Sequence, residues 1–313
     1  MTGSRITAFG YHQPAGILTN QDLEGMVETN DEWIRQRVGI VTRHIAEESE
    51  QVVDLAVPAA EKALASSGLE PDDIDLVVVA TCTQRDRSPN VAASVAARIG
   101  LRTPAAYDIN TACSGFCYAL ATADHAISAG AARHALVIGA EKMTDVTDWT
   151  DRTTCVLVGD GAGAVVVSAS DKPGIGPVLW GSEPEKGNAV RILGDWKPTF
   201  AQDGQTVYRW ATHSLAPLAR AAIEKAGYKP EDLAGVVTHQ ANLRIIEGLV
   251  KQLGVPQAVV AKDVVDSGNT SAASVPLALA KLAERGELPS GGPVLLFGFG
   301  GGLTYAGQVI TMP

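Results

Sequence analysis

The feature that most constrains the fold of this 313-residue chain is a long internal repeat. A helix-like stretch, a glycine, an acidic turn and an apolar strand follow one another over residues 58–79, and the same succession returns over residues 217–238. Residues 135–139 match residues 294–298 in the same way. Four residues of the first copy have an identical residue 159 positions later: Pro58 and Pro217, Gly68 and Gly227, Pro71 and Pro230, and Asp73 and Asp232. So long a period excludes a solenoid and predicts two pseudo-symmetric α/β halves.

The seam between the halves is predicted from the distribution of Pro and Gly. Residues 171–177 form the richest Pro/Gly stretch at mid-chain. We therefore expect an N-terminal half over residues 1–172 and a C-terminal half over residues 173–313.

Composition narrows the class of protein further. The chain is 46% hydrophobic, which suits a large α/β core, and its net charge of −10 argues against a general affinity for nucleic acid. The first residues lack the pattern of a secretory signal, and no apolar run approaches the roughly 18 residues of a membrane span. We expect a cytoplasmic protein that does not bind a membrane, with its four cysteines reduced.

Three short strings carry the chemistry. They place Cys113, His239 and Asn269 where an apolar, strand-like run gives way to a helix-like or Gly/Ala/Ser-rich stretch. A thiol, an imidazole and a carboxamide at such strand ends are typical of covalent acyl transfer. The repeat sets Cys113 opposite Ala272, close to Asn269, so a pseudo-twofold axis would bring the strings together.

Cys113 is the candidate nucleophile. It lies between a predicted strand over residues 105–112 and a predicted helix from Ser114 to about Gly130. The positive end of that helix is expected to lower the thiol pKa from its free value of about 8.5. The alternative interpretation of Cys113 is a small buried core residue. We expect core positions for the other three cysteines, because their spacing fits no metal site: Cys82, Cys117 and Cys155.

His239 follows a predicted strand over residues 235–238, and Asn242 opens a predicted helix over residues 243–253, where it is a good N-cap. Asn269 is either a turn residue or a carboxamide donor. An amide beside an imidazole would stabilise an oxyanion or an enolate.

Two glycine strings have different interpretations. Residues 159–164 fit a dinucleotide-binding fingerprint, but residues 165–168 after them read as a strand, so a tight hairpin is predicted instead. Residues 299–303 allow the backbone to approach a ligand and to donate an N–H to an oxyanion.

Taken together, the strings resemble the β-ketoacyl-acyl carrier protein synthase III family of thiolase-like condensing enzymes. The resemblance runs essentially end to end and rests on residues 30–40, 111–115, 159–164, 239–246, 268–274 and 300–302. It implies a five-layer αβαβα fold of two duplicated halves and a homodimer.

The resemblance also implies a mechanism and no cofactor or metal. Cys113 would take the acyl group from an acyl-CoA. His239 and Asn269 would stabilise the enolate formed when malonyl-acyl carrier protein loses CO2, and the backbone N–H groups of Cys113 and Gly301 would form the oxyanion hole. The product would be a 3-oxoacyl-acyl carrier protein that initiates fatty acid synthesis.

Binding contacts follow from the same resemblance. Trp33 and Arg152 would sandwich the CoA adenine, with Arg37 and Asn242 nearby, while Arg209 and Arg244 would meet the acidic carrier protein. Phe299 and Ser88 would border the acyl pocket. Many members have Phe where this chain has Ser88, so we expect a roomier pocket for branched or longer primers. No role is assigned to the charged residues 85–87.

Several alternatives remain open. Degradative or biosynthetic thiolases would need a second Cys near the C-terminal glycines, and none follows Cys155. Two-histidine elongating synthases would need His in place of Asn269. A plant-type polyketide synthase shares the Cys-His-Asn set, but residues 33–37 and 268–274 favour synthase III. The runner-up is a synthase or acyltransferase that primes a polyketide pathway. A non-catalytic partner subunit and a Cys-His-Asn hydrolase are disfavoured by the intact Cys113 and by the repeat, respectively.

Overall fold

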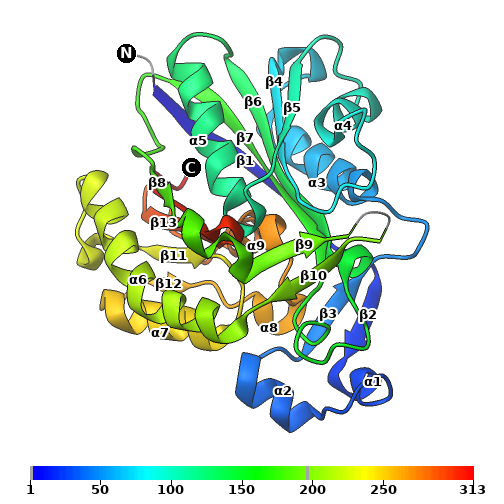
Figure 1. Ribbon diagram of the computed structural model, residues 1–313. Coiled ribbons are helices and arrows are strands. Elements are labelled where there is room, and N and C mark those ends of the chain that lie inside the picture. Colours follow the sequence, from blue (N-terminus) through cyan, green and yellow to red (C-terminus); the bar gives the residue numbers. More distant parts are fainter. Residues whose placement is uncertain (1–2, 195–196) are drawn as a thin grey trace.

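Two five-stranded sheets form the framework of the molecule (Figure 1). The computed structural model describes residues 3–194 and 197–313. The strand order is β1-β7-β6-β4-β5 in the first sheet and β8-β14-β13-β11-β12 in the second. In each sheet the last three strands named are parallel, and the first two are antiparallel to their neighbours. The two sheets therefore share one topology.

The strands of the first sheet are β1 (Gly3–His12), β4 (Leu76–Ala80), β5 (Ala105–Ile109), β6 (His134–Lys142) and β7 (Asp160–Ser170). Those of the second are β8 (Leu179–Ser182), β11 (Gly235–Thr238), β12 (Val259–Val260), β13 (Pro293–Gly300) and β14 (Thr304–Thr311). Two small antiparallel sheets pair β2 (Gly16–Thr19) with β3 (Thr42–Ile45) and β9 (Val190–Leu193) with β10 (Thr199–Gln202).

Helices form three layers around the sheets. α5 (Gly115–Ser128) and α9 (Ser274–Glu284) lie between the sheets, and their side chains share one hydrophobic core with both inner faces. The outer face of the first sheet is covered by α3 (Val52–Ser67) and α4 (Val91–Arg98), and that of the second by α6 (Gly204–Lys225) and α7 (Leu243–Leu253). The predicted five-layer αβαβα fold is confirmed. The remaining helices are α1 (Asn20–Glu24), α2 (Asp31–Val38) and α8 (Val264–Ser267).

The strand sequences explain these layers. β4 is buried along its whole length, and its side chains alternate between two cores: Val78 and Ala80 face α5, while Val77 and Val79 face α3. A strand covered on both faces needs such a continuous apolar run.

The 159-residue repeat is visible in the backbone. Short 3₁₀ turns precede α5 and α9 at Ala112–Ser114 and Ser271–Ala273, and their first residues, Ala112 and Ser271, both have a φ of 46°. These two are the non-glycine residues with positive φ in the described chain. The strands of the first sheet end at Ser170 and those of the second begin at Leu179, while the division into two units at residue 172 stays a prediction.

The hairpin predicted for residues 159–164 is wrong. Asp160 begins β7, so Gly161 and Gly163 lie inside a strand that pairs with both β1 and β6. Gly is needed there for packing: a Cβ on Gly163 would lie 2.3 Å from the backbone nitrogen of Leu277 in α9. The continuing strand does exclude a dinucleotide fingerprint, as expected.

Gly139 of β6 offers a test of this packing. A Cβ on Gly139 would lie 2.4 Å from the carbonyl oxygen of Ala272, at the turn before α9. We expect Gly139→Ala to lower the free energy of unfolding by about 1–3 kcal/mol, because backbone must move to accept the methyl group. Urea unfolding measures this change.

The matched control is Gly248→Ala in α7. No atom lies within 4 Å of a Cβ built on Gly248, so this substitution should stabilise the helix by up to about 1 kcal/mol. Equal effects of the two substitutions would contradict the close approach of the Ala272 turn to β6.

No helix in the described ranges is long and apolar enough to cross a membrane.

Candidate active site

Cys113 lies on a strained turn at the end of the first sheet. The turn connects β5 to α5, and the positive φ of Ala112 directly before Cys113 is unfavourable for a residue with a side chain. The end of β13 passes close by: a Cβ on Gly300 would lie 2.6 Å from Cys113 Cβ and 2.9 Å from its Sγ. Only a glycine at position 300 leaves room for the thiol.

The pKa of Cys113 is raised to about 11, chiefly by burial. The Ser271 hydroxyl and the backbone N–H groups of Gly301 and Cys113 favour the thiolate, and the buried carboxylate of Glu141 opposes it. The predicted lowering of the thiol pKa is therefore wrong in its net direction, because desolvation outweighs the dipoles around the sulfur. The backbone N–H groups of Cys113 and Gly301 lie at the sulfur, and their role as an oxyanion hole stays a prediction.

His239 follows β11 and is 2% exposed. Its Nδ1 lies 2.7 Å from Ser274 Oγ at the start of α9, and its ring packs edge-on against Phe299, with 5.2 Å between centroids. Burial lowers the pKa of His239 to about 3. The imidazole is thus neutral in the folded protein near neutral pH.

Acid stability should depend on His239. Its pKa is about 3 when folded and about 6.5 when unfolded. Between these values the unfolded chain binds a proton that the folded chain does not, so stability falls as pH drops from 6.5 towards 3, by up to about 1.4 kcal/mol per pH unit. Urea unfolding between pH 7 and pH 5 should show a smaller loss for His239→Gln than for the wild type. The exposed His125, changed to Gln, is the control, and equal losses in all three proteins would contradict the prediction.

Asn269 is fixed by two backbone hydrogen bonds and by one hydrogen bond to the oxygen of its side-chain amide. Its N–H donates to Leu157 O (2.8 Å), its carbonyl accepts from Gly159 N–H (3.1 Å), and its Oδ1 accepts from Ser271 N–H (2.9 Å). Because Oδ1 is occupied in this way, the amide presents its NH2 group as the free donor.

Two of the three candidate catalytic residues contact the end of β13, since Gly300 lies against Cys113 and Phe299 packs on His239. Ser271 links the Asn269 amide to the Cys113 thiol. The thiol thus comes from the first half of the repeat, and the imidazole and the carboxamide come from the second.

The residues predicted to contact CoA form a second cluster. The guanidinium carbons of Arg152 and Arg37 lie 5.2 and 5.9 Å from the centre of the Trp33 ring. Asn242 caps α7 through Arg244 N–H and donates to Arg37 O, as an N-cap was predicted to do. The cluster offers an aromatic face and two guanidinium groups, which suits a nucleotide with phosphates.

Arg209 and Arg244 lie on the neighbouring helices α6 and α7. Both are exposed, and the Arg244 guanidinium lies 5.7 Å from the ring centre of the exposed Tyr208. They provide local positive charge on a net acidic chain.

The two predicted acyl-pocket residues are in different places. Phe299 is buried beside His239, whereas Ser88 lies in an exposed loop between β4 and α4. The base of that loop is anchored by Arg85, which pairs with Asp145 at 2.5 Å. This ion pair gives Arg85 a structural place that the sequence did not indicate.

Comparisons with known proteins show the family of the chain. The family model described as 3-oxoacyl-[acyl-carrier-protein (ACP)] synthase III matches residues 107–184, and the model of its C-terminal part matches residues 223–312. The chain belongs to this family. It is a condensing acyltransferase of the thiolase-like fold.

Relatives match over their full length. The synthase is 67% identical to beta-ketoacyl-[acyl-carrier-protein] synthase III 4 of Streptomyces coelicolor, over 99% of both chains, and 67% identical to synthase III 2 of Streptomyces avermitilis, over 100% of both. It superposes on the crystal structure of the priming β-ketosynthase from the R1128 polyketide biosynthetic pathway with a TM-score of 0.97. That pair is 42% identical, with 99% of this chain and 96% of the other covered.

Sequence reasoning missed Glu141 at the end of β6. It is fully buried, and its carboxylate accepts hydrogen bonds from Thr81 Oγ1 (3.0 Å), Thr83 Oγ1 (2.6 Å), Cys82 N–H (3.0 Å) and Ala272 N–H (3.3 Å). It thereby connects the end of β4 to the turn before α9 in the synthase. The available signal was a carboxylate directly after the apolar run of residues 135–140.

The other cysteines divide into two groups. Cys117 and Cys155 are buried in the core as expected, whereas Cys82 is half-buried, with its Sγ 3.2 Å from Glu141 and 3.6 Å from Ser271 Oγ. Its neighbours place Cys82 at the edge of the candidate site.

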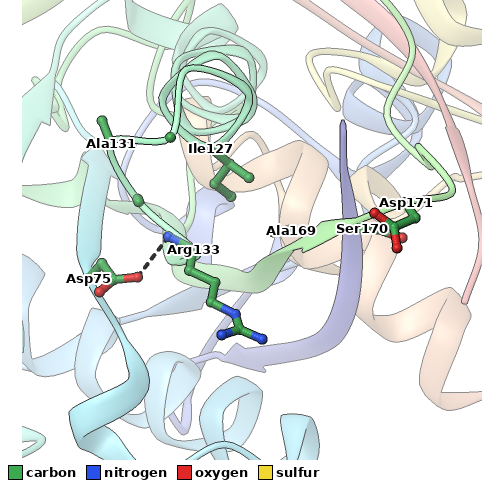
Figure 2. Close-up of a pocket in the computed structure, with 9 residues that line it drawn as sticks. Asp75, Ile127, Ala131, Arg133, Ala169, Ser170 and Asp171 are labelled. Carbon is green, nitrogen blue, oxygen red and sulfur yellow. Dashed lines mark hydrogen bonds between the residues drawn. The ribbon is translucent and has the colours of Figure 1, made fainter. Parts of the chain in front are cut away.

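A surface pocket shown in Figure 2 lies elsewhere. It is lined by Ile127 and Arg133 among others, and the Asp75 carboxylate accepts a bond from Arg133 N–H at 2.7 Å. Ile127 is at the far end of α5 from Cys113, about 20 Å away along the helix axis. This pocket is therefore separate from the thiol. The described residues contain no group of three or more His, Cys, Asp or Glu side chains that could hold a metal ion.

Proposed function

We propose that this synthase condenses an acyl-CoA primer with malonyl-acyl carrier protein, releasing CoA and CO2 and giving a 3-oxoacyl-acyl carrier protein that initiates fatty acid synthesis. The observation that carries the proposal is that Cys113 and the neutral His239 both contact the end of β13, while Ser271 links Asn269 to the thiol. A thiol forms the acyl-enzyme, and neutral donors suit an enolate oxygen.

The first half-reaction is acylation of Cys113. Its sulfur attacks the thioester carbon, while the N–H groups of Cys113 and Gly301 donate to the carbonyl oxygen as it gains charge. The C–S bond to CoA then breaks, and the CoA thiolate leaves and takes up the proton lost by the Cys113 thiol.

The second half-reaction is decarboxylation and condensation. Malonyl-acyl carrier protein loses CO2, and the enolate oxygen accepts hydrogen bonds from His239 and from the Asn269 NH2 group. The enolate carbon attacks the acyl carbon, and the Cys113 thiolate leaves and takes up a proton from solvent, which restores the thiol. No cofactor or metal enters this sequence of steps.

We assign the binding surfaces accordingly. Trp33, Arg37, Arg152 and Asn242 bind CoA. Arg152 must swing away from Trp33 to admit an adenine, because 5.2 Å between guanidinium and ring leaves no space for a third stacked layer. Arg209 and Arg244 bind the acidic carrier protein. We also propose a cytoplasmic homodimer, in which the exposed Ser88 loop reaches the partner's acyl pocket.

Priming of a polyketide pathway is the second candidate. It is supported by the TM-score of 0.97 to a priming β-ketosynthase of such a pathway. The two candidates use the same half-reactions and differ in the pathway that receives the product. Depleting the enzyme in its host separates them, since loss of membrane fatty acids would support the first and loss of a specialised product the second.

The direct test of the proposed chemistry has two stages. The protein is incubated with a panel of acyl-CoAs, and intact mass with peptide mapping locates any acyl group on Cys113. Malonyl-acyl carrier protein is then added, and CO2 and the 3-oxoacyl product are measured. An adduct without CO2 release would overturn the condensing function, and no adduct with any acyl-CoA would favour a non-catalytic partner subunit.

Primer choice should depend on Ser88. Ser88→Phe is expected to lower kcat/KM for branched or longer acyl-CoAs at least tenfold, with little change for acetyl-CoA, because the larger ring fills pocket volume. Ser88→Ala, which keeps the side chain small, is the matched control. A uniform change across all primers in Ser88→Phe would contradict a role of Ser88 in the pocket.

A further inference from the structure

The contacts of His239 leave one chemical question that decides its role. A neutral imidazole carries one proton, on Nδ1 or on Nε2, and only the nitrogen with the proton can donate. His239 can stabilise an enolate oxygen as a donor only if the proton lies on the nitrogen that faces the substrate. Its tautomer is therefore part of the site.

The partner of Nδ1 is a single hydroxyl group. Ser274 Oγ lies 2.7 Å from Nδ1, and both side chains are buried, with 1% of Ser274 and 2% of His239 exposed. Oγ also accepts a hydrogen bond from Gln240 N–H at 3.3 Å. Within the described chain these are the two hydrogen-bond partners of Ser274 Oγ.

This pattern selects the direction of the Ser274–His239 bond. A hydroxyl has one proton to give, and Gln240 N–H is itself a donor, so Nδ1 is the acceptor available to that proton. If Nδ1 carried the proton instead, Oγ would accept two N–H groups and its own proton would be buried without an acceptor. Such unpaired buried donors are strongly disfavoured.

We propose that Ser274 is a positioning residue that donates to His239 Nδ1 and so places the imidazole proton on Nε2. Because Nδ1 is turned towards Ser274, Nε2 is the ring nitrogen left to meet the enolate oxygen, and its N–H would act as a donor together with the Asn269 NH2 group. The inference rests on the proposed function for its consequence, but the tautomer itself is a property of the resting protein.

The place of Ser274 in the fold supports this assignment. Ser274 is the first residue of α9, directly after the turn that contains Ser271. Asn269 Oδ1 accepts from Ser271 N–H in the same turn. One short segment thus orients both donors, the amide through a backbone N–H and the imidazole through a side-chain hydroxyl.

The tautomer is tested by ¹⁵N NMR of histidine-labelled protein, with the His239 signals assigned from their absence in His239→Gln. We expect the Nε2–H form in the wild type and a shift towards the Nδ1–H form in Ser274→Ala. An Nδ1–H wild type, or no shift in Ser274→Ala, would overturn the proposal. The NMR measurement does not require an active enzyme, so it tests the tautomer independently of the proposed function. Failure of the proposed function would show instead as an absence of CO2 release by the wild type.

The kinetic test separates positioning from packing. Ser274→Ala should slow decarboxylation of malonyl-acyl carrier protein by about 10- to 100-fold, with acylation of Cys113 changed less than about twofold. Ser274→Thr, which keeps a hydroxyl, should restore much of the rate. Equal loss of both half-reactions in a folded Ser274→Ala protein would indicate a merely structural role and overturn the proposal.

The chain offers a matched control. Ser168 Oγ in β7 lies 2.9 Å from Nδ1 of His134, the same pair of groups outside the site. Ser168→Ala removes a comparable Ser–His hydrogen bond and should leave both half-reactions unchanged. A similar kinetic loss in Ser168→Ala would show that the effect of Ser274→Ala is not specific to His239.

Discussion

Cys113→Ala is expected to abolish acyl transfer from acyl-CoA while malonyl-acyl carrier protein is still decarboxylated. The substitution removes the sulfur that bonds to the acyl carbon, so the condensation rate should fall by at least about 10⁴-fold. His239 and Asn269 remain in place, so the donors for the enolate oxygen are retained. Intact mass of the protein after incubation with acyl-CoA and CO2 release without a primer measure the two half-reactions separately.

Cys117→Ala is the control for this experiment. Cys117 lies four residues further on in α5 and is fully buried in the core, whereas Cys113 is partly exposed, so Cys117 is not expected to take an acyl group. The variant should keep the full adduct on Cys113. An adduct that persists in Cys113→Ala and disappears in Cys117→Ala would show that the nucleophile has been assigned to the wrong thiol.

Loss of His239 or Asn269 should slow decarboxylation and leave acylation of Cys113 largely intact, the reverse of the effect of Cys113→Ala. His239→Ala and Asn269→Ala are each expected to slow decarboxylation by about 10²- to 10³-fold, equivalent to roughly 3–4 kcal/mol of transition-state stabilisation. Acylation of Cys113 should be affected far less, because its oxyanion hole consists of the backbone N–H groups of Cys113 and Gly301. Single-turnover acylation and CO2 release are the measurements.

Asn269→Asp sharpens this test. An aspartate has the same shape and can still accept from Ser271 N–H, but it lacks the NH2 donor and adds a negative charge beside the enolate. We expect a loss of decarboxylation at least as large as that of Asn269→Ala. Full decarboxylation by Asn269→Asp would rule out the donor role of the amide.

The raised pKa of Cys113 bears on how its thiol enters the reaction. A thiol whose pKa is about 11 is almost fully protonated at pH 7. The thiolate fraction falls about tenfold for each pH unit below that pKa. The groups that favour the Cys113 thiolate are the Ser271 hydroxyl and the backbone N–H groups of Gly301 and Cys113. Their hydrogen bonds can become stronger as negative charge develops during the reaction.

Much of the architecture could be predicted from the sequence. The 159-residue period correctly predicted that β4 corresponds to β11 and β6 to β13. Their apolar runs identified these segments as strands, because a sheet covered on both faces requires continuous apolar residues. Asn242 was identified as the N-cap of α7 because its side chain can accept from an N–H group of the first helical turn. The period, the apolar runs and the cap can all be read directly from the order of residues.

The failures share a different cause. Residues 159–164 were interpreted as a hairpin because glycines commonly form turns, whereas here they admit the backbone of α9 against β7. That contact joins segments more than a hundred residues apart, and no local pattern reports it.

The sequence by itself determined a duplicated α/β fold and the residue types of the active site: one thiol, one imidazole and one carboxamide. The strand end predicted directly before Asn269 is wrong, because helix α8 occupies residues Val264–Ser267. Only the tertiary structure decided their chemical states. Burial raises the pKa of Cys113 and lowers that of His239, and the contacts with Ser271, Ser274 and Glu141 set which groups donate. Desolvation and hydrogen-bond direction depend on what surrounds a group in space, so they follow from the packed fold rather than from the order of residues along the chain.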